Sequence, residues 1–212
     1  MTEKSPVSFE HKVLLALTAA VFTWSAIGPF DRLTWLLEVA PVLIGLLILV
    51  PTYQAHRLSP LLYRLILLHA VILMVGGHYT YAQVPAGFWL QDALDLSRNH
   101  YDRLGHLAQG FVPAILAREM LLKYSPLQRG RWLGFLSVSV CLAFSALYEM
   151  LEWWAAVAWG ADAESFLATQ GDVWDTQWDM FLALLGATAS IFLLSGMHDR
   201  SLEHARSIER VR

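Results

Sequence analysis

The sequence has little cysteine and little charge. Of its 212 residues, one is a cysteine, Cys141, and 16% are charged. A single cysteine excludes an intrachain disulfide and leaves the redox compartment open. No internal repeat, low-complexity tract, phosphate-binding glycine loop or basic stripe is visible, so nothing in the sequence predicts nucleic acid as a partner.

Apolar residues dominate instead, at 56% of the chain with a mean hydropathy of +0.45. A soluble domain of this length cannot bury that much apolar surface. Because lipid offers no partner for unpaired backbone groups and the alternation of a β-barrel is absent, the apolar runs predict helices. We expect an all-α fold, one transmembrane domain over residues 1–212 with six transmembrane helices near 13–28, 33–50, 61–76, 104–122, 132–159 and 177–197. The first run is expected to be a retained span, because it ends without a small-residue cleavage pattern.

Lysine and arginine are unevenly distributed between alternate connections, and this bias sets the topology of short loops. Placing both termini in the cytoplasm puts 12 of the 15 basic residues inside and leaves Arg32, Arg98 and Arg103 outside. Tryptophan has the opposite bias, since Trp132 is the one of nine that lies at the inner end. Tryptophans gathered at the outer level are typical of an interfacial aromatic belt, and the alternative is that they line a lipid or sugar site.

Two outer connections are long. The third-to-fourth connection contains 88–96, FWLQDALDL, which predicts a short amphipathic helix at the membrane interface. The fifth-to-sixth connection, 161–176, is acidic, and we interpret its Asp162 and Glu164 as solvated loop charges.

Ionisable residues enter three of the apolar segments at similar depth. Asp102 and His106 open the fourth segment and, four residues apart, share one face of a helix. Counted at about 1.5 Å per residue, they lie at the outer level of the membrane, as do two pairs of acids in the fifth and sixth segments. These pairs are Glu149 with Glu152 and Asp175 with Asp179.

Small residues follow the charged ones along each helix face. Close approach of helices in lipid needs small residues at the contact, so we expect the charged faces to point into the bundle and meet in one polar site. Glu38 and His78, near the outer ends of the second and third segments, are weaker candidates for this site, and His69 is expected to pack and bond to a neighbouring helix. The small residues are Gly110 and Ala114, then Ser145, Cys141 and Ser137, then Ala183, Gly186, Ala187 and Ser190.

Carboxylates crowded near a low-dielectric region repel one another unless a cation neutralises them. Histidine with aspartate and glutamate suits a divalent metal of the Zn, Mn or Fe type. Ion pairs with Arg103 or Arg98, or a proton or substrate pathway without metal, are the alternatives. The predicted metal ligands are Asp102, His106, Glu149, Asp175 and Asp179.

Three segments, 99–106 (NHYDRLGH), 148–154 (YEMLEWW) and 175–180 (DTQWDM), resemble the YjdF-type family of bacterial inner-membrane proteins. This resemblance covers essentially the whole chain, and the three motifs in this order are specific. More remotely, single residues in these segments are similar to the VanZ-like membrane proteins associated with glycopeptide tolerance. The first family implies a six-span protein of the bacterial inner membrane and brings no activity with it.

These features favour an enzyme that works among membrane lipids, from the periplasmic side, on a lipid or lipid-linked envelope substrate. A metal-activated water would attack a phosphoester or acyl bond, with Glu152 as general base and Arg103 neutralising negative charge. The alternatives are a carrier or binding protein for a cation, proton or small solute, and a structural protein with internal ion pairs. A carrier needs ionisable residues deep in the inner half, and the sequence shows few besides His69. The oligomeric state is left open.

Overall fold

The computed structural model describes residues 7–160, 167 and 169–210, and all regular structure in these residues is helical. The all-α prediction is therefore confirmed for them, whereas Asp162 and Glu164 lie outside the described residues. Two short elements, η1 (Tyr81–Gln83) and α4 (Pro85–Leu94), connect the two halves of the bundle. The long helices are α1 (Phe9–Ala26), α2 (Arg32–Thr52), α3 (Pro60–Tyr79), α5 (Tyr101–Tyr124), α6 (Arg131–Trp159) and α8 (Asp175–Arg210).

Four of the long helices are long and apolar enough to cross a membrane, namely α2, α3, α6 and the Asp175–Ala205 part of α8. Two of the predicted spans, α1 and α5, do not reach that standard. The first turn of α1 contains Glu10 and Lys12, and α5 has charged residues near both ends. Length and composition thus account for four of the six predicted spans.

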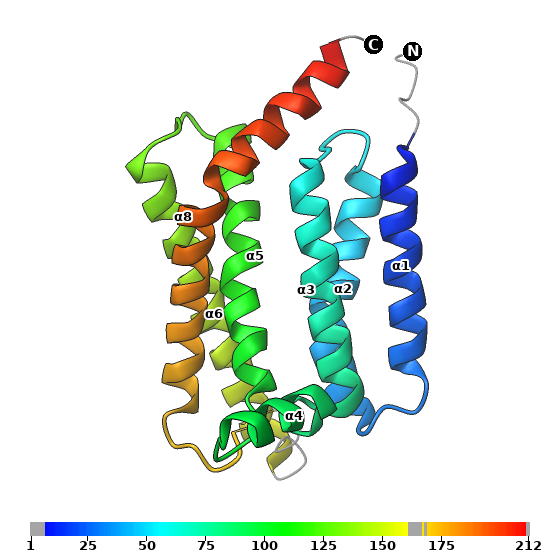
Figure 1. The fold of residues 1–212 in the computed structure, drawn as a ribbon, viewed down its shortest axis with the longest axis vertical. Coiled ribbons are helices and arrows are strands. Elements are labelled where there is room, and N and C mark those ends of the chain that lie inside the picture. The colour runs from blue at the N-terminus through cyan, green and yellow to red at the C-terminus, as the bar shows by residue number, and fades with distance from the viewer. Residues whose placement is uncertain (1–6, 161–166, 168, 211–212) are drawn as a thin grey trace.

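The long helices run roughly side by side, with α5 packed against α3, α6 and α8 (Figure 1). On the other side of α3, α1 and α2 complete the bundle. The helix α4 lies across the end at which α5 begins. The start of α1 and the C-terminal end of α8 lie at the opposite end (Figure 1).

Small residues bring α5 and α8 into backbone contact, as predicted. A Cβ added to Gly110 would collide with the backbone of Ala183, and one added to Gly186 would collide with the Leu107 carbonyl group. This contact fixes how the two helices align along their length. The other predicted seam residues are also buried, namely Ala114, Ser137, Cys141, Ser145, Ala187 and Ser190.

The helix predicted over 88–96 is present as α4, shifted toward the N-terminus by two to three residues. Pro85 begins it, because the fixed φ of proline suits the first helical position. Asp95 ends it in the left-handed conformation, with a φ of 51°. The Asn99 side chain then donates to the Val84 carbonyl oxygen at 3.0 Å and accepts from the Tyr101 amide at 3.0 Å. Asn99 thereby joins α4 to the start of α5 and positions the first turn of α5.

Candidate functional site

His106 lies at the centre of a buried polar cluster near the α4 end of the bundle. Its Nε2 atom is 3.5 Å from the Asp102 carboxylate and 3.8 Å from the Asp179 carboxylate, whereas its Nδ1 atom is 3.9 Å from the Glu149 carboxylate. The four residues are 2% to 7% exposed. The two ring nitrogens therefore face different acids, with two aspartates on one side and a glutamate on the other.

Three helices supply these four side chains. Asp102 and His106 come from the first two turns of α5, Glu149 from the C-terminal half of α6, and Asp179 from the second turn of α8. The expected meeting of the three charged faces is confirmed by these positions. What the site binds is a separate matter, and the metal remains a prediction.

Each of the four residues has a buried polar atom with no hydrogen-bond partner among the described residues. An unpaired buried polar atom costs about 1–3 kcal/mol, and more when it is charged. No lysine or arginine in the described part of the chain forms an ion pair with these carboxylates. His106 is thus the basic side chain of the cluster, without a lysine or arginine beside it among these residues. The atoms are Asp102 Oδ2, His106 Nδ1, Glu149 Oε1 and Asp179 Oδ1.

Two further acids extend the cluster. His106, Glu149 and Glu152 each have a possible metal-ligand atom, and these three atoms lie within 4.8 Å of one another. The same holds for Asp102, His106 and Asp179. On another side, Glu38 reaches in from α2, is 5% exposed, and accepts a hydrogen bond from the Tyr148 hydroxyl at 3.4 Å. The Tyr148 ring packs edge-on against His106 at 6.4 Å between ring centroids. Glu38, a weaker candidate in the sequence, is therefore part of this region.

Asp175, Arg98 and Arg103 form ion pairs beside the cluster. Arg98 donates to the Asp175 carboxylate at 2.7 Å. Arg103 pairs with Asp172 at 3.0 Å, and its guanidinium lies 5.2 Å from the centre of the Trp178 ring. Neither arginine neutralises the acids around His106, so the ion-pair interpretation applies to Asp175 and not to the cluster. This geometry does not favour Asp175 as a metal ligand.

The other histidines predicted from the sequence lie outside the cluster. His78 has its Nδ1 atom 3.0 Å from the Ser25 carbonyl oxygen and packs on the Trp24 ring, so it binds α1 and not the site. His69 packs within the bundle, but its Nε2 atom has no partner among the described residues. His69 was expected to bond to a neighbouring helix, and its Nε2 atom makes no such bond.

A second buried polar cluster lies at the other end of α5 and α8, and the sequence did not indicate it. Glu119 has no exposed surface and accepts hydrogen bonds from His198 Nε2 at 3.0 Å, Lys123 Nζ at 2.8 Å and the Ser59 amide at 3.0 Å. Arg118 donates to His198 Nδ1 at 2.8 Å. Because arginine can only donate, Nδ1 accepts and Nε2 carries the ring proton. These residues add buried ionisable groups at this end of the bundle, where the sequence analysis named few besides His69.

The fold and this site define a helical integral membrane protein with a buried Asp/His/Glu cluster. Residues 10–200 match the family described as predicted membrane protein (DUF2238), and the chain belongs to that family. It is 53% identical over 182 residues to the inner membrane protein YjdF of Escherichia coli strain K12, which covers 86% of this chain and 87% of that protein. No solved structure matches the chain. The expected resemblance and the location in the bacterial inner membrane are thus confirmed.

Proposed function

We propose that the cluster around His106 binds a divalent metal of the Zn, Mn or Fe type. The observation that supports this most directly is the set of unpaired buried atoms on Asp102, His106, Glu149 and Asp179, without a lysine or arginine beside them among the described residues. A divalent cation would neutralise the acids and coordinate the unpaired oxygens of Asp102 and Asp179. Imidazole with carboxylates is a ligand set that these metals accept.

The two sides of the His106 ring suggest how the ligands divide. Histidine ligands commonly bind a metal through one nitrogen and donate the other N–H to a carboxylate. Nε2 faces Asp102 and Asp179, and Nδ1 faces Glu149, so we assign the metal to the Nε2 side. Glu149 then orients the ring, and Glu152 lies beyond it.

The reaction that this arrangement supports best is hydrolysis or transfer at a phosphoester or acyl bond of a lipid or lipid-linked envelope substrate. The metal would supply Lewis-acid chemistry to water or to the ester oxygen. Glu152 is the nearby carboxylate available as a general base. Arg103 lies at the rim, where its pairing with Asp172 leaves it 26% exposed to meet a negatively charged group.

The topology that fits this proposal has six spans with both termini in the cytoplasm. The distribution of lysine and arginine supports it, as does the position of the start of α1 and the end of α8 at one end of the bundle (Figure 1). α5 fits as a span despite its charges, because Asp102, Arg118 and Glu119 are buried against its neighbours. The His106 cluster would then face the periplasm.

A carrier for a cation or proton is the second candidate. The buried Glu119 and His198 at the inner end favour it, because they place ionisable groups on the same two helices as the His106 cluster. The packing between the clusters opposes it. Ala114, Cys141 and Ala187 form a buried apolar layer there, and these three helices place no carboxylate or imidazole between the two clusters.

Metal analysis of the full chain purified in detergent tests the proposal. We expect about one equivalent of metal in the wild type and a loss of most of it in His106→Ala and Asp179→Asn. His78→Ala is the matched control, because His78 lies at the same end and bonds to α1 instead. Wild-type protein without metal after addition of Zn, Mn and Fe salts would rule out the proposal.

The reaction needs a separate measurement. We expect metal-loaded protein in liposomes to release product from a lipid phosphoester or ester, and Glu152→Gln to lose that activity while keeping its metal. Metal binding without turnover of the lipid phosphoester or the lipid ester would indicate a metal-binding protein that is not an enzyme. Transport of the metal into sealed vesicles would favour the carrier.

A further inference from the structure

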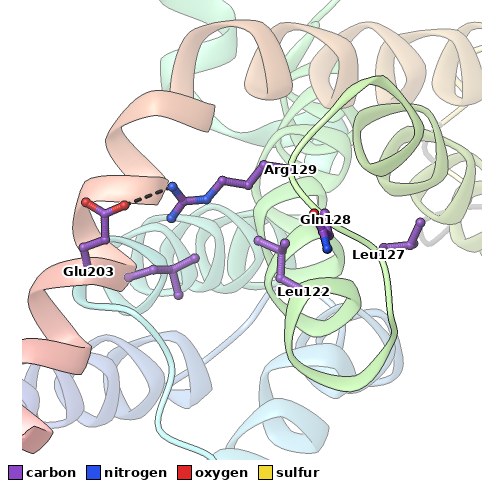
Figure 2. A pocket seen from close by; sticks show the side chains of 6 residues that line it. Leu122, Leu127, Gln128, Arg129 and Glu203 are labelled. Atoms are coloured by element: carbon purple, nitrogen blue, oxygen red, sulfur yellow. Dashed lines mark hydrogen bonds and ion pairs between the residues drawn. The ribbon is translucent and has the colours of Figure 1, made fainter.

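A cavity of about 450 Å³ lies at the opposite end of the bundle from His106. It is formed by the end of α5, the 125–130 connection and the C-terminal part of α8, and Figure 2 shows Arg129 extended from that connection toward Glu203. Three of the lining residues are apolar and three are polar. The lining residues are Leu122, Leu127, Leu202, Gln128, Arg129 and Glu203.

Two carboxylates hold the Arg129 guanidinium at this cavity. Asp199 binds its Nε atom at 3.2 Å, and Glu203 binds Nη1 at 2.9 Å. Asp199 is itself held by Arg118 at 2.8 Å and its side chain is 23% exposed, whereas the Glu203 side chain is 60% exposed. Asp199 therefore anchors Arg129, while Glu203 is an exposed partner that another anion can replace.

The position of the cavity along the helices fits the headgroup level of one leaflet. α5 ends at Tyr124 and α6 begins at Arg131, and the apolar part of α8 gives way to charged residues from His198 onward. At this level a site can meet both acyl chains and phosphates. The hollow is open to its surroundings, and its volume of about 450 Å³ exceeds what a single ion fills.

The lining offers a guanidinium beside leucine side chains, which suits an occupant with an anionic group and an acyl chain. A guanidinium offers paired donors that suit a phosphate, and basic pockets between helices bind anionic headgroups. Arg131 adds a positive charge close by and has no ion-pair partner in the described part of the chain. The leucines offer an apolar wall of the kind an acyl chain covers.

We propose that this cavity binds an anionic phospholipid, with its phosphate on Arg129 in place of Glu203 and its acyl chain against Leu122, Leu127 and Leu202. Arg129 is the recognition residue, and Glu203 competes with the ligand. The site is independent of the His106 cluster and of which membrane face the termini occupy.

Lipid titration of the full chain in a neutral detergent tests the proposal. Bound lipid is counted by native mass spectrometry with phosphatidylglycerol or phosphatidylcholine as the probe. We expect the wild type to prefer phosphatidylglycerol, Arg129→Gln to weaken its binding about tenfold, and Glu203→Gln to strengthen it several-fold. Arg64→Gln is the matched control, because Arg64 also pairs with an exposed glutamate, Glu10, at 2.6 Å and does not line the cavity.

Each contrary result overturns the site. Equal binding of the two lipids would remove the charge selectivity. Equal losses in Arg64→Gln and Arg129→Gln would replace the cavity with a general effect of positive charge. Weaker lipid binding in Glu203→Gln would show that the Arg129–Glu203 pair is purely structural. Complete displacement of the bound lipid by inorganic phosphate would identify a free anion as the ligand in place of a lipid.

Discussion

Gly110 of α5 lies against the backbone of Ala183 of α8, with no room for a Cβ between them. His106 is four residues before Gly110, and Asp179 is four residues before Ala183. One turn above a backbone contact, these two side chains are therefore neighbours, and their polar atoms are 3.8 Å apart. The small-residue contact and the polar cluster are thus consecutive layers of one interface.

Gly110→Ala is expected to destabilise the bundle by about 1–3 kcal/mol, because the new Cβ forces α5 and α8 apart. Intrinsic helix propensity alone would make the alanine variant more stable by up to about 1 kcal/mol. A loss of stability therefore reports the collision between the helices and not helix propensity. Gly45→Ala in α2 is the matched control, since a Cβ there meets nothing within 4 Å. Unfolding in detergent measures both variants, and equal stability of the two would contradict the close contact.

His106→Ala and Arg103→Ala should behave differently when a chelator is added. Without its imidazole the cluster keeps its acids and loses a ligand, so His106→Ala should have a lower melting temperature that the chelator no longer changes. Arg103→Ala should change stability by no more than about 1 kcal/mol, because the Arg103–Asp172 pair is partly exposed. A wild type that is insensitive to chelator, together with severe destabilisation by Arg103→Ala, would favour ion pairing over metal.

Glu119→Ala is expected to cost about 3–5 kcal/mol, because it leaves the His198, Lys123 and Ser59 donors at a buried site without their acceptor. Glu203→Ala is the comparison, since it removes a glutamate from an ion pair with an exposed side chain and should cost under about 1 kcal/mol. Denaturant unfolding in detergent gives both values. A tolerated Glu119→Ala would mean that the cluster around Glu119 does not hold α3, α5 and α8 together.

Cysteine labelling in intact cells checks the proposed topology. The native Cys141 is 2% exposed and should stay unlabelled. We expect Asp92→Cys in α4 to react with a membrane-impermeant maleimide from the periplasm, and His204→Cys in α8 to react only after permeabilisation, because both native side chains are exposed at opposite ends. The reverse pattern would invert the orientation and move the His106 cluster to the cytoplasmic face.

The candidate site could be predicted only in part. Counting residues from the helix ends placed Asp102, His106, Glu149 and Asp179 at one depth, and the small-residue rule gave their facing, because both depend on regular helix geometry. The partners of Arg98, Arg103 and Asp175 were not predictable, since they depend on the fold of the connection near Thr169 and Asp172. Spacing along one helix does not reveal which loop charge lies beside it.

The cluster around Glu119 shows the same limit of the sequence analysis. Glu119 and Lys123 are four residues apart, which in the sequence is typical of an exposed pair on a helix surface. Glu119 is buried because α8 continues past the apolar run and brings His198 against it, while the start of α3 supplies the Ser59 amide. These contacts join residues separated by 79 and 60 positions.

The sequence by itself determined a helical membrane protein, its family and the helix faces that point inward, since hydrophobicity and the 3.6-residue period act locally. The tertiary structure alone decided which charges are neutralised by arginine and which, around His106, are not. It also decided that α5, although too polar to qualify as a span by composition, is the helix on which α3, α6 and α8 pack. The physical reason is that burial and ion pairing are properties of contacts between helices, and those contacts are fixed only when the small-residue faces meet.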